Sequence, residues 1–525
     1  MPSTASETAP AEHWVIRILP PVLITAGIVL RAVLYLRDRG FWFDEAALSV
    51  NILDVPILSL LRPLPEYHQA APPGYLALVK CAVWLLGGSE YAFRLVPLLF
   101  GIAAIFLFWR LAGRLLDRWL AVLSLAVFAF GAWAIYYSAE AKQYSSDLTL
   151  AAGVLLLALD VFDRGADVRR VAALGAAGFV ALFISHAIVF VLAGIGLVLL
   201  IDAVRQREKR SFVTMSAVGA FWASGFALLY VTSLRHIAVR PSLLTYWRPA
   251  FMPFPPRSLE DAEWIFGRIY SLFSTPFALH PRQVTLIFCA VGIVSFWRSR
   301  RFRHLGLLLL PMFFAVAASA FQRYPVDGRL MLFMVPAAII LTAQGVYAIC
   351  RAVNSWKFAK VIAAVVVLTF LYDPVVRGLN TVLRPKPRPD VRAVLAYAAA
   401  NRRPADAYFF DGSAAPACKY YAPRYGIDPE STVTGDETIE DPTESAARLE
   451  NLASSPRAWI VYSEIEPSAA RPEEQALVDY LDRYGRIADR FSQANSLVML
   501  YERKEAVGAV PDIGAVPDGL AKQVK

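Results

Sequence analysis

The stretch Phe41-Trp42-Phe43-Asp44-Glu45 places two adjacent carboxylates among aromatic residues, directly after the first long apolar run at residues 14–36. A charged side chain at the centre of a membrane helix costs about 2.5–3.5 kcal/mol on insertion scales, so such groups usually have a partner or a function. Whether this rule applies to the pair depends on whether the rest of the chain lies in a membrane.

The composition is that of a membrane protein. The chain has 525 residues, of which 57% are hydrophobic and 18% are charged, whereas charged residues make up about a quarter of a soluble domain. The net charge of +9 is explained by arginines in short loops, so nucleic acid is not expected as a partner. The N-terminus lacks the basic region of a cleavable signal. The four scattered cysteines indicate neither a disulfide framework nor a zinc site.

Repeated apolar runs of spanning length predict a mostly α-helical, polytopic membrane bundle of about eleven spans. The predicted spans are 14–36, 93–109, 119–138, 148–162, 171–185, 187–203, 212–234, 283–297, 305–321, 330–350 and 358–373. Short arginine-rich loops separate alternate pairs of spans, and the positive-inside rule assigns these loops to the cytoplasm. The N-terminus is then inside and the C-terminus outside.

The same alternation decides the ambiguous segments. Residues 73–86 form a run of only about 14 residues that includes Lys80, so we expect an interfacial helix on the outer surface. We interpret residues 263–279 in the same way. Both ends of 171–203 are basic, so this segment must cross an even number of times and is predicted to be a hairpin that turns near His186.

Four regions are expected. They are a transmembrane catalytic domain at 1–374, within it a first outer loop with interfacial helices at 37–92, an extracytoplasmic α/β domain at 375–505, and a disordered tail at 506–525. In the α/β domain, periodicity predicts helices at 390–400 and 473–484 and strands at 407–410, 458–462 and 496–502.

The unusual polar residues are all predicted to lie at the outer face. They are Asp44, Glu45, His68 and Lys80 in the first loop, Glu140, Lys142, Gln143, Tyr144 and Asp147 after the third span, His186 in the hairpin turn, and Arg323, Tyr324, Asp327 and Arg329 after the ninth span. Carboxylates and cations at one water–lipid boundary suit an anionic lipid substrate together with a nucleophile that must lose a proton. We therefore expect them to converge on one lipid-accessible cavity.

The order and spacing of several short motifs resemble GT-C glycosyltransferases, in particular bacterial family-39-type enzymes, protein O-mannosyltransferases and lipid A aminoarabinose transferases. The matching pieces are Asp44-Glu45, Pro72-Pro73-Gly74-Tyr75-Leu76, Ser89-Glu90-Tyr91-Ala92-Phe93-Arg94-Leu95, Tyr136-Tyr137-Ser138-Ala139-Glu140-Ala141-Lys142-Gln143-Tyr144 and Tyr324-Pro325-Val326-Asp327-Gly328-Arg329-Leu330. Together they extend over about the first 350 residues. One departure is that Ala70-Ala71 precede Pro72, where many relatives have His or Lys.

The resemblance implies an inverting enzyme of the bacterial cytoplasmic membrane with an extracytoplasmic active site. Its donor would be a polyprenyl-phosphate-linked sugar, and its acceptor a glycan, lipid or protein. Asp44 would be the general base, with Glu45 and Asp147 as further acids. Lys142, Arg329, Lys80 and Tyr144 would bind the donor phosphate, and a divalent metal would be held by Glu45, His68 and His186.

Other interpretations stay open at this point. Asp44 and Glu45 would also suit the N-terminus of a structural helix, and Lys142 would suit an interfacial anchor. A lipid-linked-saccharide transporter and a non-catalytic membrane assembly subunit are the alternative functions. A transporter is expected to have internal repeats and polar residues near the bilayer midplane, and the sequence shows neither.

Overall fold

The computed structural model describes residues 10–67, 69–237, 240–429, 432–434, 450–464 and 472–504. His68 and the predicted disordered tail at 506–525 lie outside these residues. The chain forms two compact units. Unit 1 consists of residues 1–37, 57–63 and 70–385, and unit 2 of residues 38–56, 64–69 and 386–525.

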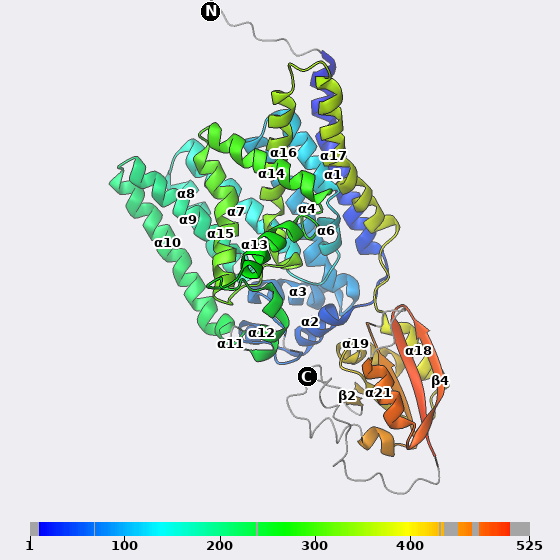
Figure 1. Ribbon diagram of the computed structural model, residues 1–525. Helices are drawn as coiled ribbons and strands as arrows, with labels where there is room; N and C mark the ends of the chain where they lie inside the picture. The colour runs from blue at the N-terminus through cyan, green and yellow to red at the C-terminus, as the bar shows by residue number, and fades with distance from the viewer. Residues whose placement is uncertain are drawn as a thin grey trace, which may run out of the picture. The chain divides into compact units, whose positions relative to one another are not determined.

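Unit 1 is helical (Figure 1), and eight of its described helices are long and apolar enough to cross a membrane. They are α1 (Pro10–Leu36), α4 (Glu90–Leu115), α7 (Tyr144–Arg164), α9 (Ile188–Arg205), α10 (Lys209–Leu229), α15 (Phe302–Ala320), α16 (Val335–Ala352) and α17 (Ala359–Leu383). Each coincides with a predicted span, so the chain is a multi-pass membrane protein.

The remaining helices of unit 1 are shorter. They are η1 (Ile57–Leu61), α3 (Pro73–Leu86), α5 (Arg118–Ala129), α6 (Ala132–Tyr137), α8 (Val168–Ile184), η2 (Tyr230–Leu234), α11 (Arg235–Ile237), α12 (Pro241–Trp247), η3 (Arg248–Ala250), α13 (Leu259–Leu272), α14 (Arg282–Arg298) and η4 (Gly328–Met334). The predicted spans 171–185 and 283–297 correspond to α8 and α14, which have 17 residues each. The count of eleven spans stays a prediction.

Two local predictions are confirmed. α8 ends at Ile184 and α9 begins at Ile188, so the apolar segment 171–203 is a helical hairpin with His186 in its turn. The Ser185 hydroxyl accepts a hydrogen bond from the Ile188 amide at 3.2 Å, which satisfies a backbone donor in the first turn of α9. The segment 73–86 is the helix α3, and Pro73 begins it, as proline commonly does at the first helical position. The interfacial position of this helix at the outer surface stays a prediction.

The predicted span 119–138 is interrupted. α5 ends at Ala129 and α6 starts at Ala132, with Phe130 and Gly131 between them. An arginine binds the C-terminus of α5. The fully buried Arg31 of α1 donates a hydrogen bond from Nη1 to the Ala129 carbonyl at 3.1 Å. A positive charge is favourable at a helix C-terminus. The interaction explains how α1 accommodates an arginine within a spanning segment.

Close helix packing in unit 1 depends on glycine. α14 and α16 meet at Gly292 and Gly345, where an added Cβ would collide with the backbone carbonyls of Leu341 and Phe288, respectively. Small residues that let two backbones approach in this way are typical of membrane helix pairs.

Unit 2 contains a five-stranded sheet in the order β2-β1-β3-β5-β4. The strands are β1 (Ala407–Phe410), β2 (Val433–Thr434), β3 (Arg457–Tyr462), β4 (Gly485–Gln493) and β5 (Ser496–Arg503). β1 is parallel to β2 and β3, whereas β5 is antiparallel to β3 and β4. The helices of unit 2 are α2 (Phe43–Asp54), α18 (Val391–Asn401), α19 (Ala415–Tyr421), η5 (Ala422–Tyr425) and α21 (Pro472–Leu481).

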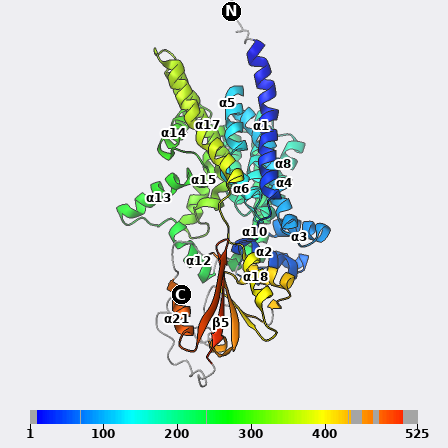
Figure 2. The ribbon, with the colours of Figure 1, turned by 90° about the vertical axis from the view of Figure 1, so that its right-hand side faces the viewer.

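The sheet is covered on both faces (Figure 2). Ile460 and Tyr462 of β3 pack in the same core as Leu481 of α21. Trp459 points to the opposite face, as alternation along a strand requires, and its ring lies 6.2 Å from that of Tyr397 in α18. The helices and strands predicted for this region are therefore present, together with β2, β4 and α19, which the sequence analysis did not predict.

Unit 2 also contains the beginning of the first loop. The Phe41 amide donates to the Tyr421 hydroxyl at 2.9 Å, and the Phe41 ring lies 4.9 Å from that of Tyr420. The Arg392 guanidinium forms an ion pair with Asp38 at 2.6 Å. The division differs from the predicted boundary at residues 374/375 in two ways, because α17 continues to Leu383 and because residues 38–56 pack with the C-terminal region.

Candidate active site

The two acids of the opening stretch begin α2. Trp42 is the N-cap in extended conformation, and Asp44 and Glu45 lie in the first helical turn, where negative charge is favourable. Their environments differ. Glu45 is completely buried, whereas Asp44 is half-buried.

Glu45 has a cationic partner. Its Oε2 lies 3.0 Å from Nη1 of Arg388, a residue of the proline-rich segment 384–389, and the Arg388 side chain is only 10% exposed. The guanidinium also lies 5.9 Å from the centre of the Trp42 ring. A buried carboxylate held in this way acts as a fixed structural anion, and of the two neighbouring acids Asp44 is the one with surface available to a substrate.

The third predicted acid, Asp147, lies in unit 1. It is 4% exposed in the first turn of α7, and the Ser185 hydroxyl donates a hydrogen bond to it from the turn between α8 and α9. Its Oδ1 has no hydrogen-bond partner among the described residues. The neighbouring Ser146 hydroxyl lies 3.4 Å from the Ile184 carbonyl, which joins the same two elements. Asp147 therefore presents one buried acceptor oxygen whose hydrogen bonding is incomplete.

Aromatic rings and one arginine surround the start of α7. The Arg329 guanidinium lies 5.7 Å from the ring centre of Tyr144 and 6.0 Å from that of Trp247. The Tyr144 ring lies 5.0 Å from that of Tyr137. Cation–π contacts of this kind limit the orientations of a guanidinium, a planar group that can bind phosphate with two parallel hydrogen bonds.

Two further polar side chains lie in the turns beside Asp147. The Tyr324 hydroxyl donates to the Leu330 carbonyl at 2.7 Å. Burial raises the pKa of the Tyr324 phenol, and the charges of Asp147 and Tyr144 raise it further, so this hydroxyl stays protonated. Burial also lowers the pKa of His186 to about 4, so its imidazole is neutral at pH 7.

The structure brings some of the predicted site residues together. In unit 1, Arg329 contacts Tyr144, and Asp147 lies in the first turn of the same helix. Lys142 is 4% exposed just before α7, and Lys80 is half-buried on α3. Asp44 and Glu45 belong to unit 2. The predicted convergence of all these groups on one cavity stays a prediction.

The predicted metal ligands are not gathered within the described residues. No three His, Cys, Asp or Glu side chains lie together there. Glu45 is paired with Arg388 in unit 2, His186 belongs to unit 1, and His68 lies outside the described residues. The metal requirement stays a prediction.

Sequence reasoning missed three residues of these sites. Arg388 gave no signal, because it is 343 residues from its partner Glu45 in a segment with the composition of a linker. Ser185 gave a weak signal as a polar residue beside His186 in the middle of an apolar run. Trp247 gave no signal, because its proximity to Arg329 depends on tertiary structure.

The fold of the chain is the one expected from the resemblance to GT-C enzymes. Solved structures of two kinds share this fold. ArnT from Cupriavidus metallidurans in the apo state aligns with 94% of this chain and 98% of its own at 13% identity, with a TM-score of 0.52. The archaeal oligosaccharyltransferase AglB from Archaeoglobus fulgidus, in complex with an inhibitory peptide and a dolichol-phosphate, aligns with 94% of this chain and 75% of its own at 13% identity, with a TM-score of 0.53.

Two other structures of these proteins contain ligands. One is ArnT bound to undecaprenyl phosphate, which aligns with 93% of this chain and 98% of its own at 14% identity, with a TM-score of 0.51. The other is the Archaeoglobus fulgidus oligosaccharyltransferase in complex with Zn and sulfate, which aligns with 92% of this chain and 73% of its own at 14% identity, with a TM-score of 0.54. No protein-family model and no curated protein sequence matches the chain. At these identities the likeness defines the fold.

Proposed function

We propose that the protein is an inverting glycosyltransferase that moves a sugar from a polyprenyl-phosphate donor to an acceptor hydroxyl at the outer face of the cytoplasmic membrane. The observation that carries the proposal is the fold shared along nearly the whole chain with ArnT, one structure of which is bound to undecaprenyl phosphate. The acceptor is a glycan, lipid or protein.

Asp44 is the general base in this proposal. Its carboxylate accepts the proton of the acceptor hydroxyl as that oxygen forms a bond to the anomeric carbon. The bond between the anomeric carbon and the phosphate oxygen breaks on the opposite side, and polyprenyl phosphate leaves with the electron pair. The different environments of the two acids support this role, because Glu45 is committed to Arg388 and Asp44 is half-buried.

Lys142 and Arg329 stabilise the leaving phosphate, with Lys80 and Tyr144 as further phosphate-binding residues. The planar guanidinium of Arg329 already contacts two aromatic rings, so it loses less side-chain freedom when it binds an anion. Asp147 is the second acid of the proposal. Its incompletely bonded Oδ1 is suited to accept a hydrogen bond from a hydroxyl of the donor sugar.

Replacement of the base tests the proposal. We expect Asp44→Asn to lower sugar transfer by about 10²- to 10⁴-fold, because a positioned general base contributes about that factor. Transfer is measured in membranes supplied with lipid-linked donor. Asp54→Asn is the matched control, because Asp54 is an exposed acid at the other end of the same helix. Wild-type transfer by a normally folded Asp44→Asn protein would refute the assignment.

A second test concerns the leaving group. We expect Arg329→Gln to lower the rate by about 10²- to 10³-fold, as loss of one preorganised donor does elsewhere. Arg329→Lys should recover only part of this loss, because lysine keeps the charge without the planar fork. Arg323→Gln is the control, because Arg323 is exposed and lies six residues before Arg329. If Arg329→Lys were fully active, the planar guanidinium would have no special role.

A further inference from the structure

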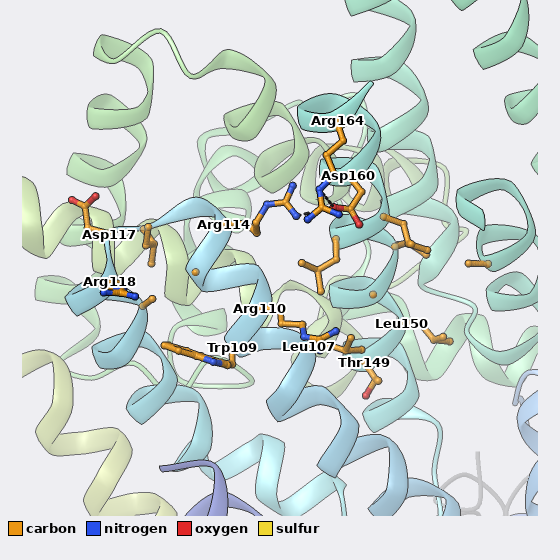
Figure 3. A pocket seen from close by; sticks show the side chains of 18 residues that line it. Leu107, Trp109, Arg110, Arg114, Asp117, Arg118, Thr149, Leu150, Asp160 and Arg164 are labelled. Atoms are coloured by element: carbon orange, nitrogen blue, oxygen red, sulfur yellow. Dashed lines mark hydrogen bonds and ion pairs between the residues drawn. The ribbon is translucent and has the colours of Figure 1, made fainter. Parts of the chain in front are cut away.

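A groove in unit 1, distinct from the residues discussed above, lies between the C-terminal part of α4 and the length of α7 (Figure 3). Its volume is about 1030 Å³, and the start of α5 and one residue of α8 complete its walls. That volume reaches the upper end of the range of about 300–1,000 Å³ that holds small molecules. Two glycines, Gly113 and Gly153, lie along its walls, and nothing lies within 4 Å of a Cβ built on Gly113.

Most of the groove is apolar, and only some of its charged residues form ion pairs within the protein. Arg114 at one end is held by Asp160 and Asp163, each at 2.7 Å. Arg110 and Arg118 also line the groove and are exposed, and neither forms an ion pair with any residue that the structure describes. Figure 3 shows Arg110 on the side of Thr149 and Arg118 across the groove from α7. The site therefore combines an apolar wall with two cations available to an anion.

The groove is long enough for the acyl chains of one leaflet. Along α7 the lining residues extend from Thr149 to Arg164, the last residue of the helix, which is about 22 Å at 1.5 Å per residue. Half of a hydrocarbon core about 30 Å thick is about 15 Å, so such chains fit within this length. The basic loops at this end of α4 and α7 belong to the side that the positive-inside rule assigns to the cytoplasm.

We propose that this groove is a selective binding site for an anionic glycerophospholipid of the cytoplasmic leaflet. Its acyl chains lie along the apolar wall between α4 and α7, and its phosphate and anionic headgroup are bound by Arg110 and Arg118. Basic pockets between membrane helices bind anionic headgroups in this way. The lipid is neither donor nor product of the proposed transfer reaction, so the site is independent of the proposed function.

The test is lipid binding by the full-length protein. Delipidated protein is titrated with phosphatidylglycerol and separately with phosphatidylethanolamine, and bound lipid is counted by native mass spectrometry. We expect tighter binding of phosphatidylglycerol. Arg110→Gln with Arg118→Gln should weaken it by about 30-fold, which corresponds to about 1 kcal/mol for each arginine, and should leave phosphatidylethanolamine binding unchanged.

Two further variants separate the site from general charge effects. Arg205→Gln with Arg298→Gln removes two exposed arginines from outside the groove and should leave phosphatidylglycerol binding as in the wild type. Gly113→Leu places a side chain in the open space of the groove and should lower binding with all arginines present.

Equal affinity for the two lipids, or unchanged binding by the Arg110/Arg118 double variant, would overturn the proposal. Dimers that disappear in Gly113→Leu would also overturn it, because they would show that a second copy of the chain fills the groove.

Discussion

Glu45 in unit 2 and Asp147 in unit 1 are both buried acids in the first turn of a helix, but they are stabilised differently. Glu45 faces the Arg388 guanidinium at 3.0 Å and has no exposed surface. Asp147 has the neutral Ser185 hydroxyl as its side-chain partner, and one of its oxygens has no partner in the described part of the chain. An ion pair leaves little capacity for a ligand, whereas an incompletely bonded carboxyl group retains it. The comparison therefore favours a structural role for Glu45 and supports the proposal that Asp147 binds the donor.

The largest effect is expected at Glu45. Glu45→Gln should destabilise unit 2 by about 3–5 kcal/mol, because it leaves the nearly buried Arg388 without its charge partner. Thermal unfolding followed by protease sensitivity of the C-terminal region measures this loss. The control is Glu66→Gln, which removes the exposed pair of Glu66 with Lys419 at 3.6 Å and should cost about 0–1 kcal/mol. Equal losses of stability in the two variants would show that the buried Glu45–Arg388 pair contributes no more than an exposed ion pair.

A smaller effect is expected at Asp147. Ser185→Ala removes the hydroxyl that donates to Asp147 and should cost about 1–3 kcal/mol, because a buried acceptor loses its partner. The same hydroxyl accepts from the Ile188 amide, so part of the loss belongs to the N-terminus of α9. A double-mutant cycle with Asp147→Asn isolates the pair. A coupling energy near zero would show that the hydroxyl serves α9 alone.

At neutral pH the smallest effect concerns His186, the residue next to Ser185, because its contribution to stability changes only as the pH falls. Its pKa in the folded protein is lowered to about 4 by burial, so below its usual pKa of about 6.5 the unfolded chain binds the proton more readily. Stability contributed by the neutral ring should therefore be present above pH 6.5 and be lost progressively as the pH falls towards 4. His186→Gln should flatten this part of the stability profile, whereas His236→Gln, at an exposed position, should not. If the stability profile of His186→Gln were identical to that of the wild type, protonation of the His186 ring would not destabilise the folded protein.

Features set by local pattern were predictable from the sequence. The hairpin at His186 followed from charge alternation and helix length, and β1 followed from the apolar stretch Ala407–Phe410 between polar residues. β4 was missed because it is an edge strand whose residues are largely exposed, so its sequence GRIADRFSQ lacks a continuous apolar face. The break between α5 and α6 was missed because Phe130 and Gly131 continue an apolar run, and the arginine that caps α5 comes from α1.

The sequence indicated which residues of the candidate site are unusual, but it did not indicate which partners they contact. Asp44, Asp147 and Arg329 stood out as charged residues beside apolar runs, a local property. The partners that distinguish the two buried acids are remote in sequence, since Arg388 is 343 residues from Glu45. Spacing carries no information about such pairs, and the sequence analysis therefore placed both acids in the site, with Asp44 as the general base and Glu45 as a further acid and metal ligand.

The membership of residues 38–56 in unit 2 sets an order for biosynthesis. α2 leaves the ribosome among the first segments, yet the cation that neutralises Glu45 and the tyrosine that binds the Phe41 amide are translated only after α17. Until then α2 has no completed sheet domain to pack against. A nascent chain arrested before Arg388 would therefore present α2 to chaperones and proteases, and unit 2 can mature only after the last membrane helix has been synthesised.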